Sequence, residues 1–118
     1  MAEQIAAEVL IEAVAGFLKS IEGELSGQSG FHAKVAANAL AIVARELAQR
    51  PFDVEAASLG SFLGHDAPVA ALRAEVCGRL RMGQLTPETP GLIEALMAGA
   101  MAKVAVDNPR YSTLGRMI

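Results

Sequence analysis

The chain has 118 residues, of which 53% are hydrophobic and 19% are charged, and its formal net charge at pH 7 is −3. This length and composition suit one folded domain with a hydrophobic core and exclude a disordered chain. No run of basic residues is present, which argues against nucleic-acid binding through neutralised phosphates. The one cysteine, Cys77, excludes a disulfide within the chain and fits a reducing compartment.

Aromatic residues make up only 4% of the chain and tryptophan is absent, so the core must be built from Ala, Leu, Val, Ile and Met. Such a core favours closely packed helices over a sheet, which is usually richer in β-branched and aromatic residues. We therefore predict an all-α protein. Its fold should be a compact bundle of about five helices with short connections, in a single domain of residues 1–118.

The first predicted helix covers residues 2–24, because Ile5, Val9 and Ile21 recur at helical spacing. Residues 25–30 are rich in Gly and Ser and are predicted to form a turn. The second helix covers residues 31–47. Pro51 prevents it from continuing, because the proline ring clashes with the carbonyl group four residues before it.

The helix over residues 31–47 is the one around which we expect the others to pack. Apolar side chains and alanines cover most of its circumference, which is typical of a helix surrounded by other helices. Asn38 lies between Val35 and Ile42 on the side expected to be packed. Because a buried amide needs hydrogen-bond partners, we predict that Asn38 bridges two helices.

The ends of the next two helices are marked by capping residues. The third helix should begin with Asp53 as its N-cap and end before Gly64. The fourth should begin at Asp66, with Pro68 tolerated in the first turn, and end before Gly83.

The last helix covers residues 90–106, with Thr89 preferred as its N-cap and Pro90 at its first position. Residues 95–102 include no polar side chain, and the small residues Ala95 and Gly99 lie on one line of this helix. A second copy of the chain could approach such a line closely, so we predict a two-fold homodimer through this helix. The rival interpretation is that the helix lies in the middle of its own bundle.

The tail over residues 109–118 holds four large apolar side chains, namely Tyr111, Leu114, Met117 and Ile118. It is too apolar for a free end, and we predict that it is ordered against a neighbouring helix or a second subunit.

Three segments carry a resemblance to a known family: FHAKVAANAL (31–40), LRAEVC (72–77) and KVAVDNPRY (103–111). In this order they resemble a bacterial family of small all-helical proteins of unknown function. Members are often encoded beside aminoglycoside-phosphotransferase-like kinases and acyl-CoA dehydrogenases. The resemblance implies a role near acyl-CoA or phosphorylated-intermediate metabolism, and it brings no established activity or catalytic residue. Many relatives have Arg where this chain has Lys34, which weakens any argument for bidentate anion recognition there.

The polar residues of the second helix, His32, Asn38 and Arg45, form one candidate site. Asn38 and Arg45 are seven residues apart and share a face of the helix. Together with His32 they could hold a ligand in an interhelical cleft, or they could be satisfied within the bundle. His65 is the only other histidine, and no zinc-site spacing is present, so we expect no metal site.

The other candidate residues for ligand or partner binding are Arg73, Arg79, Arg110 and Tyr111. Arg73 and Arg79 could contact a phosphate group, or they could form a solvated helix face. Glu75 precedes Arg79 by four residues, and we expect these two to pair on one face.

Two functions remain open on these grounds. The first is a non-catalytic helical interaction or accessory protein that supports a partner enzyme, either a kinase-like phosphotransferase or an acyl-CoA enzyme. The second is a small enzyme or acyl-ligand-binding protein that uses His32, Asn38 and Arg45. Convergence of these three side chains in a cleft would favour the second.

We lean toward the non-enzymatic function and expect no cofactor. Acidic residues such as Glu3 and Glu8, with no basic region, argue against a signal peptide. The most apolar stretch, residues 92–106, is shorter than the about 20 residues that span a bilayer. We therefore expect a cytoplasmic protein that contacts neither membrane nor nucleic acid.

Overall fold

The structure is a computed structural model that describes residues 5–111 and residue 114. In these residues it contains five α-helices, one short 3-10 helix and no strand, which confirms the predicted all-α class. The chain divides into two compact units, Met1–Gln49 and Arg50–Ile118, which are called unit 1 and unit 2 below. The predicted single domain over residues 1–118 stays a prediction.

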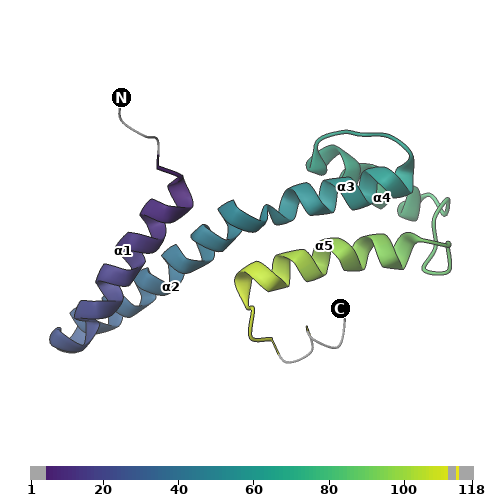
Figure 1. The fold of residues 1–118 in the computed structure, drawn as a ribbon. Helices are drawn as coiled ribbons and strands as arrows, with labels where there is room; N and C mark the ends of the chain where they lie inside the picture. The colour runs from purple at the N-terminus through teal and green to yellow at the C-terminus, as the bar shows by residue number, and fades with distance from the viewer. Residues whose placement is uncertain (1–4, 112–113, 115–118) are drawn as a thin grey trace. The chain divides into compact units, whose positions relative to one another are not determined.

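Unit 1 is a helical hairpin (Figure 1). Helix α1 (Ala7–Ile21) is followed by the 3-10 helix η1 (Glu22–Glu24) and by α2 (Gly27–Gln49), which packs along α1. The turn predicted over residues 25–30 is wrong beyond its first two residues, because α2 already begins at Gly27, where φ is +60°. Gly30 allows the chain to return tightly, since a Cβ atom there would lie 2.8 Å from the carbonyl oxygen of Leu25.

Helix α2 is not surrounded by other helices within its unit. Its fully buried residues are three alanines, Ala33, Ala37 and Ala44. Phe31 is 64% exposed, and Asn38 is also exposed. The prediction that Asn38 bridges packed helices is therefore wrong for this chain. The physical reason is that the described part of unit 1 has only two α-helices, and α1 covers one side of α2 while Asn38 lies about 120° around the helix axis from that side.

Unit 2 contains α3 (Pro51–Leu63), α4 (Val69–Arg81) and α5 (Leu92–Asp107). Helix α3 packs against both α4 and α5 (Figure 1). The buried core side chains come from all three helices and from the loop before α5: Leu59, Leu72, Val76, Leu85, Leu92 and Ala95. This unit therefore has the closed apolar core that unit 1 lacks.

The predicted starts of α3, α4 and α5 are wrong by two or three residues, and the first helix, predicted over residues 2–24, is α-helical from Ala7 to Ile21. Helix α3 begins at Pro51, a position where the missing N–H of proline is tolerated, and Asp53 lies within its first turn. Helix α4 begins at Val69 with Pro68 as N-cap, instead of at Asp66.

The start of α5 is set by a glycine instead of by a threonine cap. Gly91, with φ at +88°, precedes the first helical residue, Leu92. The hydroxyl of Thr89, the predicted cap, accepts a hydrogen bond from the backbone N–H of Thr86 at 2.9 Å. The predicted ends are confirmed at Gly64, where φ is +89°, and near Gly83, where φ is +75°.

The small residues of α5 pack inside unit 2. Ala95 and Gly99 are buried, and a Cβ atom on Gly99 would lie 2.8 Å from Cγ of Glu55 on α3. The line that was predicted to meet a second copy therefore contacts α3 of the same chain. The homodimer itself stays a prediction, and so does the ordered tail, because residues 112–113 and 115–118 lie outside the described residues.

Candidate functional site

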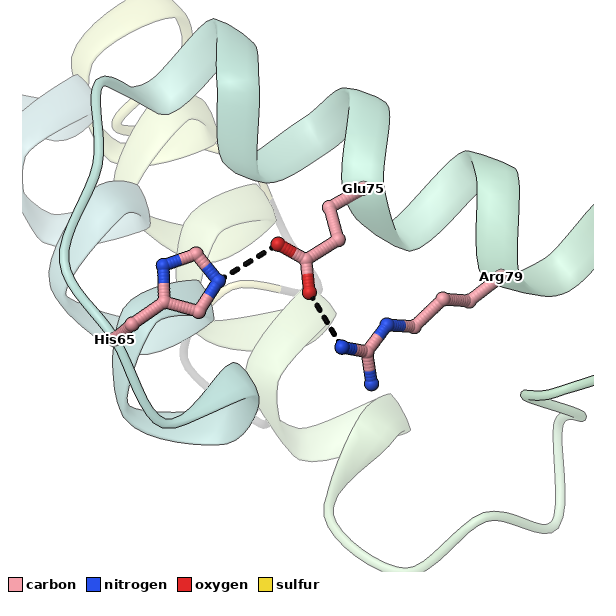
Figure 2. Close-up of polar contacts among 3 residues, drawn as sticks. All are labelled: His65, Glu75 and Arg79. Atoms are coloured by element: carbon pink, nitrogen blue, oxygen red, sulfur yellow. Dashed lines mark hydrogen bonds and ion pairs between the residues drawn. The ribbon is translucent and has the colours of Figure 1, made fainter.

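A polar network joins the loop after α3 to helix α4 (Figure 2). Nε2 of His65 lies 2.7 Å from Oε1 of Glu75, and Nη2 of Arg79 lies 2.7 Å from Oε2 of the same carboxylate. Because a carboxylate only accepts, Nε2 of His65 is the donor. The predicted pairing of Glu75 with Arg79 is confirmed, and His65 is a partner that helical spacing could not reveal.

The loop of His65 lies directly against α3. The backbone N–H groups of Gly64 and His65 both donate to the carbonyl of Gly60, at 2.7 Å and 3.1 Å. A Cβ atom on Gly60 would lie 2.9 Å from the carbonyl oxygen of His65, so the close approach depends on glycine. The network of His65, Glu75 and Arg79 therefore fixes the exit of α3 against α4. All three side chains remain accessible to solvent, and exposed pairs of this kind contribute little to stability.

A second polar cluster joins all three helices of unit 2 around the ring of Phe52. Arg73 of α4 donates from Nε to Oε2 of Glu55 on α3 at 2.7 Å, and a second bond from Nη2 to Oε1 makes the pair bidentate. The guanidinium carbon of Arg73 lies 5.6 Å from the ring centroid of Phe52, and Nζ of Lys103 on α5 lies 5.0 Å from it. Cation–π contacts at exposed sites are worth about 0.5–1 kcal/mol each.

The charges of this second cluster are compensated. The hydrogen bonds from Arg73 lower the pKa of the Glu55 carboxyl below its ordinary value, and the same bonds raise the pKa of Arg73. Lys103 pairs with Asp107 at 3.2 Å. Each cation near Phe52 thus has its own carboxylate, so the cluster connects helices and offers no excess positive charge to an anion.

The predicted site residues of α2 do not share one face. His32 and Asn38 are exposed, Arg45 is half-buried, and the ring centroid of His32 lies 6.0 Å from that of Phe31. His32 is six residues before Asn38, which places it about 120° around the helix from the face that Asn38 shares with Arg45. Arg110 and Tyr111 are exposed after the end of α5.

Several exposed apolar side chains lie together on one side of unit 1. Two stripes of side chains define it, each with the spacing i, i+4, i+7 and i+11. The α1 stripe is Leu10, Val14, Phe17 and Ile21, and the α2 stripe is Ala36, Leu40, Val43 and Leu47. The side chains of Leu10, Val14 and Phe17 are 52%, 50% and 62% exposed, and those of Val43 and Leu47 are 39% and 42% exposed. We call the two stripes together the hairpin face.

Residues 23–111 match a known family, described as a domain of unknown function (DUF6285). The chain belongs to this family. The matched region includes α2 to α5, and α1 precedes it. The resemblance to a helical family of unknown function is thus confirmed at this level. No curated protein and no solved structure matches the chain.

None of the helices in the described part of the chain is long and apolar enough to cross a membrane. Within residues 5–111 and 114, no three His, Cys, Asp or Glu side chains gather closely enough to hold a metal ion.

Proposed function

We propose that this DUF6285 chain is a non-catalytic helical interaction protein. The observation that carries the proposal is that α1, a helix of 15 residues, has no buried residue. Helix α1 packs along α2, and this contact brings none of its residues into the buried class. Because a helix in a protein gains most of its stability from packing of its apolar face, a further surface over α1 would stabilise it.

The exposed residues of the hairpin face are contiguous and not scattered. Leu10, Val14 and Phe17 follow one another along successive turns of α1, and each is at least half exposed. Single exposed apolar residues are common on any protein, whereas a contiguous patch usually marks an interaction site. The hairpin face is therefore the surface through which we propose that the chain binds.

The alternative, an enzyme or acyl-ligand carrier using His32, Asn38 and Arg45, has weaker support. These side chains do not converge, because His32 lies about 120° around α2 from the other two. The two polar clusters of unit 2 are compensated ion pairs that connect helices. As the further partner that the interaction protein supports, we propose a bacterial cytoplasmic enzyme of the kinase-like or acyl-CoA class, on the ground of the sequence resemblance alone.

The test is affinity capture from the native host with three baits: the wild type, Phe17→Glu and Lys19→Glu. Both substitutions place a glutamate on α1, but Lys19 lies about 160° around the helix from Phe17. The proposal expects the wild type and Lys19→Glu to recover the same proteins, among which the host's own copy of this chain counts, and Phe17→Glu to lose them. Equal recovery by all three baits, or no recovery above an unrelated bait, would contradict it.

A further inference from the structure

The hairpin face has two halves, and they lie on the same side of unit 1. Successive residues of an α-helix lie about 100° apart around its axis. Viewed from the N-terminus of α1, the α1 stripe lies counterclockwise of Ile11, Ala15 and Leu18, the line of residues that packs on α2. Viewed from the N-terminus of α2, the α2 stripe lies counterclockwise of the buried residues Ala33, Ala37 and Ala44. Because α1 and α2 are antiparallel, a counterclockwise offset on both helices places both stripes on the same side of the hairpin. The two stripes therefore form one continuous apolar surface.

The opposite side of the hairpin is charged. Glu12 and Lys19 of α1 lie clockwise of its packed line, and Lys34 of α2 lies clockwise of its buried alanines. All three are exposed. These two sides of unit 1 therefore differ, one being charged and the other apolar. The exposed side chains of Val9, Phe31 and Val35 lie on the outer edges of the two helices and belong to neither side.

We propose that the occupant of the hairpin face is the hairpin face of a second copy of this chain, so that two hairpins form an intermolecular four-helix bundle. This inference rests on the proposed function, because it requires the hairpin face to be an interaction surface. Spacing of i, i+4, i+7 and i+11 is the pattern by which helices pack in four-helix bundles. In a bundle of two hairpins every helix packs against two neighbours.

The size of the hairpin face agrees with what a stable dimer needs. Five large side chains of the two stripes, those of Leu10, Val14, Phe17, Val43 and Leu47, are between 39% and 62% exposed. Since a fully buried aromatic side chain removes roughly 150–250 Å² from water, five large side chains that are about half exposed present on the order of 100 Å² each, or roughly 500 Å² per copy. A two-fold pair that covers all of them buries about 1,000 Å², the lower limit expected of a specific interface.

The test is sedimentation equilibrium of the full chain, as wild type and as Phe17→Glu, Leu10→Glu and Lys19→Glu. We expect a wild-type dimer at micromolar concentration and an unchanged dimer for Lys19→Glu. Each of the two hairpin-face substitutions should weaken dimerisation by at least about 30-fold, because it places a carboxylate at the centre of an apolar contact. Far-UV circular dichroism shows whether the variants keep their helices, and two variants are used so that one can fail to fold.

A wild type that stays monomeric at micromolar concentration would overturn the inference, and so would a dimer that survives both hairpin-face substitutions. The proposed function has a separate readout. If the purified wild type is monomeric while capture of another protein still requires Phe17, the interaction surface is real and its occupant is not a second copy. If capture does not require Phe17 either, the proposed function fails too.

Discussion

Gly99 is the residue at which α5 passes the side chain of Glu55. The absence of a Cβ atom matters here, because such an atom would come within 2.8 Å of Cγ and 3.2 Å of Cβ of Glu55. The same glutamate holds Arg73 in a bidentate pair, so the packing of α5 and the charge pair between α3 and α4 share one side chain.

We expect Gly99→Ala to lower the free energy of unfolding of the chain. Overpacking of this kind costs about 1–3 kcal/mol, which outweighs the about 0.5–1 kcal/mol that alanine gains over glycine inside a helix. The control is Gly78→Ala in α4, where a Cβ atom would meet nothing within 4 Å. This control should raise the free energy of unfolding by about 0.5–1 kcal/mol. Urea denaturation measures the free energy of unfolding of both variants. Equal shifts would show that a Cβ atom at position 99 makes no unfavourable contact with Glu55.

At the same scale, the sequence could predict only those polar pairs that lie within one helix. Glu75 and Arg79 are four residues apart, and their pairing follows from helical geometry alone. The bond from His65 to Glu75 and the pair of Arg73 with Glu55 depend on how α3 and α4 pack, which no local pattern contains. Asn38 shows the opposite error, because an apolar neighbourhood in the sequence indicated burial that the two-helix unit does not provide.

Helix α4 shows which kind of contact holds an element in unit 2. One side carries Leu72, whose side chain is 0% exposed, and Val76, and both belong to the apolar core. Another side carries Glu75, which bridges His65 and Arg79 at the surface. Burial of an apolar side chain contributes more than an exposed ion pair, so the core side should dominate.

We therefore expect Leu72→Ala to cost about 2–5 kcal/mol of stability and Glu75→Ala no more than about 1 kcal/mol. Both substitutions introduce alanine into α4, at positions three residues apart, so the change in helix propensity is nearly the same for the two variants. Thermal or urea unfolding followed by circular dichroism measures the difference. Equal losses would mean that the polar network of Figure 2 holds α4 as strongly as the core does.

At the scale of elements, the sequence predicted the number of helices and their order, because helical periodicity extends over many residues. It placed several starts wrongly. Gly91 and Gly27 adopt positive φ values immediately before or at the start of a helix, where the sequence alone favoured a threonine cap at Thr89 and a turn over residues 25–30. Cap preference is a local signal, and it gave way here to the backbone turn that brings each helix onto its neighbour.

At the scale of the whole molecule, the two units differ in how they bury apolar surface. Unit 2 has three helices and a core that includes Leu59, Leu72 and Leu92. In unit 1, α1 has no buried residue, and the buried residues of α2 are alanines. The periodicity of α1 predicted a helix correctly, whereas the apolar circumference of α2 predicted burial on most sides, which unit 1 does not provide. Neither pattern could show that only one of the two units would close its own core, because that depends on which helices become neighbours.

The central claim is that a second copy completes unit 1, and hydrogen exchange measured over a range of protein concentrations tests it most directly. Amides of α1 exchange through opening of a helix that is stabilised by dimerisation, so their protection should rise as the protein concentration rises. Amides of α3 and α5, which pack within unit 2, should show far less dependence on concentration. Protection of α1 that stays the same from the lowest to the highest concentration, whether weak or strong, would contradict the account.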